Sequence, residues 1–155
     1  CSTFKRSGCS TFKRSAMVIV DTSIWIEAGR RNGDLGCKIG LENLLEAYEA
    51  AWCSPVKLEF LGGARQQDRQ KLEFWLACIP YRPVEEQHWE TAKQHAWKLR
   101  DRGITLPWND ILIATLALDL DCRAYARDGH FETMATHLGL RLYQPGYGGR
   151  YNPED

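Results

Sequence analysis

Hydrophobic and polar positions along the chain follow two kinds of pattern. Short apolar runs have the length of strands that are buried on both faces, and they occupy residues 17–20, 51–54, 122–126 and 140–143. Longer stretches place apolar residues three or four positions apart, as amphipathic helices do, and they cover residues 40–51, 54–62, 66–77, 84–102, 110–118 and 131–137. Because strands and helices alternate, we predict an α/β sandwich around a parallel sheet.

The segment ahead of Met17 is set apart by a repeat. Residues 1–7 (CSTFKRS) recur without change as residues 9–15. A perfect duplication ahead of a methionine is typical of an added extension, and the alternative is a native basic arm for nucleic acid. We therefore assign residues 1–16 to an extension and 17–143 to one domain. The remaining residues, 144–155, are rich in Gly, Pro and Tyr and are predicted to form a surface tail.

This division changes the charge of the predicted domain. The chain has 20 basic and 20 acidic residues, and the extension holds four of the basic ones and none of the acids. The rest of the chain therefore has 16 basic and 20 acidic residues, a net charge of −4. Whole-chain charge gives no support to nucleic-acid binding, so any RNA contact must come from a local basic patch.

Cysteine spacing and hydropathy exclude several other classes of protein. Outside the extension the cysteines are Cys37, Cys53, Cys78 and Cys122. They form no CxxC pair, so we expect isolated buried thiols rather than a zinc site or a disulfide framework. No apolar run approaches the roughly 20 residues that cross a membrane, and the N-terminus lacks the apolar core of a secretory signal. We expect a cytoplasmic protein.

Four acidic residues interrupt the apolar patterns. Asp21 and Asp128 each follow a predicted strand, and in parallel sheets ligands gather beyond the carboxyl ends of the strands. Glu59 lies inside an apolar run, and Asp110 opens the most hydrophobic helix of the chain. Taken singly, each has another explanation as a helix cap, a loop acid or an exposed helix position. Their joint arrangement in one α/β frame favours a site.

The chemistry of such a site follows from its ligands. Clustered carboxylates without nearby His or Cys ligands favour hard cations, namely Mg²⁺ or Mn²⁺. Ions of this kind activate a bound water and offset charge on a phosphate, so phosphoryl transfer is the expected reaction. The sequence has no P-loop, dinucleotide glycine motif or Ser-His-Asp order that would favour a competing interpretation.

The segments around these acids resemble the PIN-domain family. Residues 20–26 (VDTSIWI) are similar to its opening strand and loop, and residues 57–63 (KLEFLGG) to its second acidic motif. Residues 107–115 (PWNDILIAT) are similar to the third motif, an aspartate that opens a buried helix. Residues 126–131 (ARDGHF) are similar to the fourth. The motifs occur in the family's order, and the resemblance covers essentially all of residues 17–143.

This resemblance implies a PIN-like three-layer sandwich with a central, mainly parallel sheet of four to five strands flanked by helices. It implies that Asp21, Glu59, Asp110 and Asp128 bind one or two Mg²⁺ or Mn²⁺ ions. Ser23 occupies a polar position of the first motif, where it either supports the metal shell or is a simple turn hydroxyl. Members of the VapC type are toxins of toxin–antitoxin pairs. They usually form homodimers and are silenced by an antitoxin that fills the active-site groove.

Five further residues receive an interpretation from their positions. Arg127 flanks Asp128 and is a candidate contact for the RNA backbone. Asn109 is predicted as a helix N-cap, and Glu27 as an exposed loop acid. His130 is the histidine closest to a predicted site residue, although a surface role is favoured. Trp97 lies off the apolar stripe of its helix and is the best candidate for a dimer interface.

We therefore predict a metal-dependent endoribonuclease, the toxin of a toxin–antitoxin pair. The alternatives are a catalytically inactive PIN-like binding module and a structure-specific DNA nuclease. Retention of four acids favours an enzyme over a binding module, because a scaffold gains nothing from buried, clustered charge. The short chain lacks the additional helices that structure-specific DNA nucleases usually carry.

Overall fold

The computed structural model describes residues 15–146. Most of the predicted extension (1–14) and most of the predicted tail (147–155) lie outside the described residues. Within residues 15–146, no helix is both long enough and apolar enough to cross a membrane.

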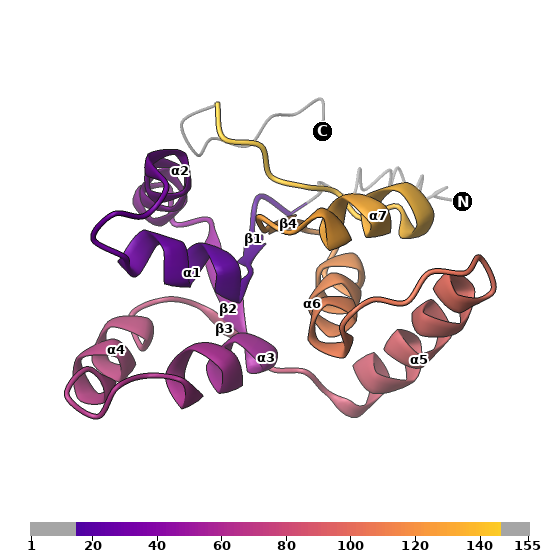
Figure 1. The fold of residues 1–155 in the computed structure, drawn as a ribbon, viewed down its shortest axis with the longest axis horizontal. Helices are drawn as coiled ribbons and strands as arrows, with labels where there is room; N and C mark the ends of the chain where they lie inside the picture. The colour runs from indigo at the N-terminus through magenta and orange to yellow at the C-terminus, as the bar shows by residue number, and fades with distance from the viewer. Residues whose placement is uncertain (1–14, 147–155) are drawn as a thin grey trace, which may run out of the picture.

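Four short strands form a parallel sheet at the centre of the molecule (Figure 1). They are β1 (Val18–Val20), β2 (Ala50–Cys53), β3 (Tyr81–Arg82) and β4 (Arg123–Tyr125), in the spatial order β3-β2-β1-β4. All neighbouring strands are parallel, which confirms the predicted sheet. Strand β1 is fully buried, as expected of a central strand between two layers of helices.

The ends of the sheet differ from the prediction. The predicted strand at 140–143 reduces to a single parallel bridge between Leu142 and Ala124 of β4. Strand β3 was not predicted, because it has only two residues and lies between Pro80 and Pro83. So short a strand between prolines has no alternating pattern to read.

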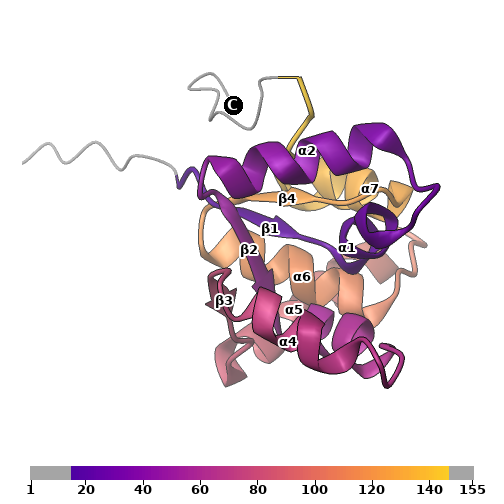
Figure 2. The ribbon, with the colours of Figure 1, turned by 90° about the vertical axis from the view of Figure 1, so that its left-hand side faces the viewer.

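Helices cover both faces of the sheet. Figure 1 shows α1, α2 and α4 on one side of the strands and α5, α6 and α7 on the other. The view in Figure 2 has α2 and α4 in front of the strands and α5 and α6 behind them. The arrangement confirms the three-layer sandwich. The helices are α1 (Thr22–Gly29), α2 (Leu35–Glu46), α3 (Ser54–Val56), α4 (Arg69–Leu76), α5 (Glu86–Arg100), α6 (Trp108–Asp119) and α7 (Gly129–Leu138), and the π-helical turn η1 (Lys57–Leu61) continues α3.

Three helix boundaries, in α1 and α2, depart from the apolar pattern. The segment expected as a strand followed by a loop, 20–26, becomes helical from Thr22, because Asp21 caps α1. Helix α2 begins at Leu35 rather than at residue 40, because the Asp34 carboxylate accepts a hydrogen bond from Cys37 N at 2.8 Å. It also ends earlier than predicted, since Ala50 belongs to strand β2.

The core confirms the prediction for α6 and corrects three others. Helix α6 is buried over seven consecutive residues, from Ile111 to Ala117, and it contacts β1 and β4. Trp75 and Trp89 lie on the apolar stripes of the predicted helices 66–77 and 84–102, so the pattern predicts that they face inward, but both are exposed. Cys78 is exposed as well, whereas the three other cysteines of the described part are buried; all four are free thiols.

Candidate functional site

Asp21 lies at the carboxyl end of β1, where this strand adjoins β4. Its backbone N–H donates to the carbonyl of Tyr125 at 2.8 Å, so the two strand ends are joined at this point. The Asp21 carboxylate caps α1 and accepts two hydrogen bonds from Ser23, from the backbone N at 3.0 Å and from Oγ at 2.6 Å. The residue is only 3% exposed, so its charge is held away from bulk water.

Burial has a clear electrostatic consequence for Asp21. Loss of solvation raises the pKa of its carboxyl to about 6, although the hydrogen bonds from Ser23 oppose the change. The negative charges of Asp110 and Glu59 raise the pKa further. Asp21 therefore shares an electrostatic environment with two of the other acids that the sequence singled out.

Asp110 enters the same region from the first turn of α6. Its side chain is largely buried, and burial raises its pKa. His130 lowers the pKa of Asp110, because its Nδ1 lies 2.8 Å from Asp110 Oδ2. The negative charges of Asp128 and Glu59 raise the pKa further. Asp110 thus interacts with both acids that lie closer to solvent.

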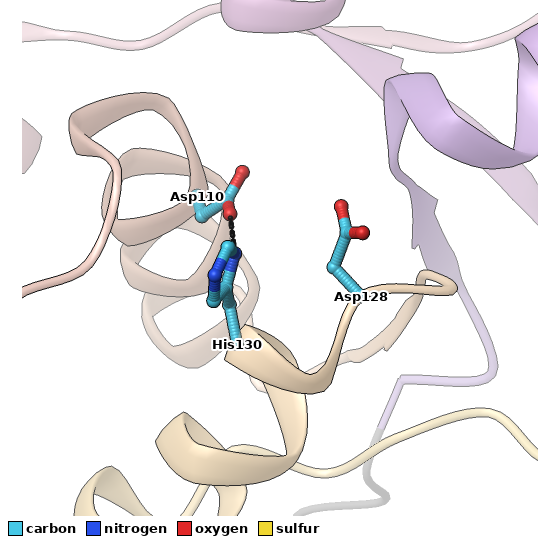
Figure 3. A group of neighbouring side chains, drawn as sticks. All are labelled: Asp110, Asp128 and His130. Atoms are coloured by element: carbon cyan, nitrogen blue, oxygen red, sulfur yellow. Dashed lines mark hydrogen bonds and ion pairs between the residues drawn. The ribbon is translucent and has the colours of Figure 1, made fainter.

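Asp128 faces Asp110 from the start of α7. It occupies the N-cap position of this helix, yet among the described residues its side chain caps no backbone N–H. One carboxylate oxygen from each of Asp110 and Asp128 and a ring nitrogen of His130 all lie within 4.8 Å of one another. In Figure 3 the Asp110 and His130 side chains point toward each other, and Asp128 stands opposite them.

Glu59 reaches the site from η1. It is exposed, and Oε1 accepts a hydrogen bond from the side-chain amide of Asn109. Asn109 was predicted as an N-cap, but Pro107 occupies that position, so Asn109 lies in the first turn of α6 with its amide turned to Glu59. The π-helical geometry of η1 is of a kind that is frequent at functional sites.

Ser23 and Arg127 lie together beside Asp21. The Arg127 backbone N–H donates to Ser23 Oγ at 3.3 Å, so one hydroxyl joins the turn after β4 to the Asp21 carboxylate. The Arg127 guanidinium pairs with Glu27 at 2.9 Å. This turn therefore holds a basic group next to Asp128.

The prediction for Glu27 was wrong. It belongs to α1 rather than to a loop, and its side chain is 12% exposed. Its carboxylate accepts a hydrogen bond from Asp34 N at 2.8 Å, and this bond is the main reason that its pKa is lowered, followed by the charges of Arg127 and Arg30. Glu27 forms ion pairs with Arg30 and Arg127.

His130 was given a surface role from sequence, and the structure places it against Asp110. The available signal was its position two residues after Asp128, at the start of a helix. That signal was not sufficient, because contact with Asp110 depends on how α7 packs against α6.

Two grooves flank the acidic residues. One, of about 380 Å³, is lined by Ser23, Ile26, Glu27, Arg30, Arg127 and Asp128. The other, of about 710 Å³, is lined in part by Ile26, Arg30, Glu59, Arg65 and Lys71. They share Ile26 and Arg30. Basic side chains therefore line the surface on which Glu59 and Asp128 are exposed.

Comparisons with known proteins agree with this architecture. The PIN domain family matches residues 18–136. Ribonuclease VapC11 of Mycobacterium tuberculosis is 32% identical over 130 residues, which cover 81% of this chain and 96% of that protein. VapBC2 of Rickettsia felis, solved with a DNA fragment from its promoter, has a similar fold, with a TM-score of 0.66 at 17% identity, covering 82% of this chain and 97% of that one. A toxin–antitoxin complex from Klebsiella pneumoniae also has a similar fold, with a TM-score of 0.58 at 19% identity. The match covers 88% of this chain and 97% of that one. The chain therefore belongs to the PIN-domain family and, within it, to the VapC type.

Proposed function

We propose that this protein is a metal-dependent endoribonuclease that acts in the cytoplasm as the toxin of a toxin–antitoxin pair. The observation that carries the proposal is the convergence of Asp21, Asp110 and Asp128 beyond β1 and β4, with Glu59 beside them. The VapC proteins that this chain resembles are named as ribonucleases. In this proposal residues 17–143 form the catalytic domain, and residues 1–16 take no part in it.

The donor atoms of the site fit a divalent cation. Carboxylate oxygens are the preferred ligands of Mg²⁺ and Mn²⁺, and four carboxylates share this region. The raised pKa values of Asp21 and Asp110 reflect negative charge that burial disfavours, and a cation would offset that charge. When bound, such an ion supplies Lewis-acid chemistry and an activated water.

Each acid then has a defined part in the proposal. Asp21 and Asp110 are metal ligands, and Ser23 fixes the orientation of the Asp21 carboxylate through its two hydrogen bonds. Asp128 binds the ion directly or through water. Glu59, held by Asn109, either binds the ion or orients the attacking water. All four carboxylates are therefore proposed as catalytic.

The substrate is proposed to lie along the two grooves. Their basic residues, Arg30, Arg65, Lys71 and Arg127, are suited to phosphate groups, which supply most of the affinity for nucleic acids. Arg127 directly precedes Asp128 in sequence and lines the same groove. This local basic surface offsets the mildly acidic charge of the domain.

Two protein partners belong to the proposal. A similar solved structure is a toxin–antitoxin complex, and we infer a cognate antitoxin for this chain. We also infer a homodimer. A groove of about 630 Å³ between α5 and α6 is lined by Trp89, Trp97 and Trp108, whose exposed rings suit an interface with a second copy.

The test is cleavage of total RNA and transfer RNA by the full chain with Mg²⁺, with Mn²⁺ and with a chelator. Asp21→Asn is run in parallel, and Asp101→Asn, at the exposed end of α5, is the matched control. We expect cuts that require metal, persist in Asp101→Asn and disappear in Asp21→Asn. RNA that is bound but left intact would favour the binding module, and cleavage of DNA alone would favour the DNA nuclease.

A further inference from the structure

His130 holds a position that four carboxylates alone would not require. It lies in the first turn of α7, and its Nδ1 is 2.8 Å from Oδ2 of Asp110, a residue of α6. Figure 3 shows the imidazole directed at the Asp110 carboxylate, with the Asp128 side chain to one side of the pair. The ring is not packed away in the core, because 44% of the side chain is exposed.

The three side chains have the spacing of a metal site with mixed ligands. Asp110 and Asp128 each offer an oxygen and His130 offers a nitrogen, and these three atoms lie within 4.8 Å of one another. They are drawn from two different helices, so their proximity does not follow from sequence spacing alone. Three donor atoms this close together can be ligands of one ion.

We propose that His130 is a nitrogen ligand of the metal ion held by Asp110 and Asp128, so that the site binds Mn²⁺ in preference to Mg²⁺. The inference rests on the metal dependence proposed above and adds to it the identity of the ion. Mg²⁺ demands oxygen ligands in near-octahedral geometry and keeps several waters. Mn²⁺ also suits carboxylate and water oxygens, but as a first-row transition ion it accepts an imidazole nitrogen among them more readily than Mg²⁺ does. One imidazole among carboxylates therefore shifts the preference toward Mn²⁺.

The hydrogen bond to Asp110 is compatible with this role. In the tautomer that donates to Asp110 the proton is on Nδ1, and in the other neutral tautomer it is on Nε2. Because the ring is partly exposed, it can carry its proton on Nε2 next to water and turn the Nδ1 lone pair to an ion. The same nitrogen thus faces Asp110 before the ion binds and faces the ion afterwards.

A competing role for His130 is to position Asp110 through the hydrogen bond without touching the ion. Such outer residues also affect metal binding, often by roughly 10- to 100-fold. The two roles predict different effects of losing His130 on the affinities for Mn²⁺ and Mg²⁺. Loss of a positioning hydrogen bond weakens every ion alike, whereas loss of a nitrogen ligand weakens Mn²⁺ and leaves Mg²⁺ almost unchanged.

The test measures metal binding on the full chain, without RNA. Electron spin echo spectroscopy of bound Mn²⁺ detects a directly coordinated ¹⁴N nucleus, and titration calorimetry gives the affinities for Mn²⁺ and Mg²⁺. The variants are His130→Gln and, as matched control, His137→Gln, which lies on the same helix and pairs with Arg102 instead. We expect ¹⁴N modulation in the wild type and in His137→Gln and none in His130→Gln. We also expect Mn²⁺ affinity to fall about tenfold in His130→Gln, with little change for Mg²⁺.

Several results would overturn the inference. Mn²⁺ that binds without ¹⁴N modulation excludes His130 as a ligand, and equal weakening of both ions assigns it to positioning. Failure of the wild type to bind Mn²⁺ overturns both this inference and the proposed metal dependence. Metal-dependent RNA cleavage without ¹⁴N modulation removes only this inference. A ¹⁴N signal in a protein that leaves RNA intact removes only the proposed function.

Discussion

The side-chain amide of Asn109 donates a hydrogen bond to Oε1 of Glu59, a residue fifty positions earlier in the chain. The bond joins η1 to the first turn of α6 and so connects Glu59 to the residue beside Asp110. Glu59 is exposed, and without this restraint its carboxylate would sample many rotamers. Asn109 therefore restrains the position of the Glu59 carboxylate.

Substitution Asn109→Ala is expected to weaken the metal site. A side-chain hydrogen bond of this kind contributes about 0.5–1.5 kcal/mol, so the metal concentration for half-maximal RNA cleavage should rise roughly 2- to 10-fold. Titration of Mn²⁺ against cleavage rate measures the change. Asn43→Ala in α2 is the matched control and should behave as the wild type. An unchanged metal requirement in Asn109→Ala would show that the bond does not position Glu59.

Substitution Asp21→Asn is expected to stabilise the metal-free protein at neutral pH. The folded-state pKa of Asp21 is raised from 3.8 to about 6, so ionisation of Asp21 opposes folding. The penalty is absent below about pH 4, grows as the pH rises to about 6 and is complete above it. A pKa difference of that size lowers the free energy of unfolding by about 3 kcal/mol at most.

Urea unfolding in chelator at pH 4 and at pH 7.5 measures this effect. Asp21→Asn should exceed the wild type in free energy of unfolding at pH 7.5, and the two should converge at pH 4. Added Mn²⁺ should stabilise the wild type far more than the variant, because the variant lacks one ligand. A variant that is less stable than the wild type at pH 7.5 would contradict the argument.

Substitution Arg127→Ala is expected to impair RNA binding and to leave metal binding intact. Arg127 is paired with Glu27 in the groove that contains Asp128. Loss of one phosphate contact should reduce the slope of log RNA affinity against log salt concentration by about one. We expect KM for RNA to rise about 3- to 10-fold, with a smaller change in kcat. Arg102→Ala, at the end of α5, is the control. Equal salt dependence in both variants would remove Arg127 from the substrate path.

Sequence patterns identified the edge of the sheet but not the contacts made there. Asp21 and Asp128 follow strands that are buried and parallel, and this alone places them on the same edge. The bond from Asn109 to Glu59 depends on side-chain rotamers and on the packing of helices that are distant in sequence. The same holds for Glu27 with Arg127, because no periodic pattern encodes a pair one hundred residues apart.

Amphipathic patterning predicted most of the buried stripe of α5 but not its tryptophan. Its apolar stripe predicted a buried Trp89, yet Trp89 is 54% exposed and Trp97 is 57% exposed. Ala92 and Ala96, on the same predicted stripe, are buried, so small residues contact α6 and the tryptophans line the groove between the helices. A hydrophobic pattern identifies an apolar face of a helix. It does not show whether that face packs in the core of the same chain or against another protein chain.

Substitution Trp97→Glu is expected to dissociate the inferred homodimer. Buried tryptophans at the centre of interfaces often contribute 2 kcal/mol or more, so the dimer Kd should rise by a factor of about 30 or more. Sedimentation velocity across a concentration series measures the dimer Kd. Leu35→Glu, at another exposed apolar position in the first turn of α2, is the control. The four carboxylates lie outside α5, so metal binding should persist in the Trp97→Glu monomer. A dimer that survives Trp97→Glu and dissociates in Leu35→Glu would move the interface to the α1–α2 side of the sheet.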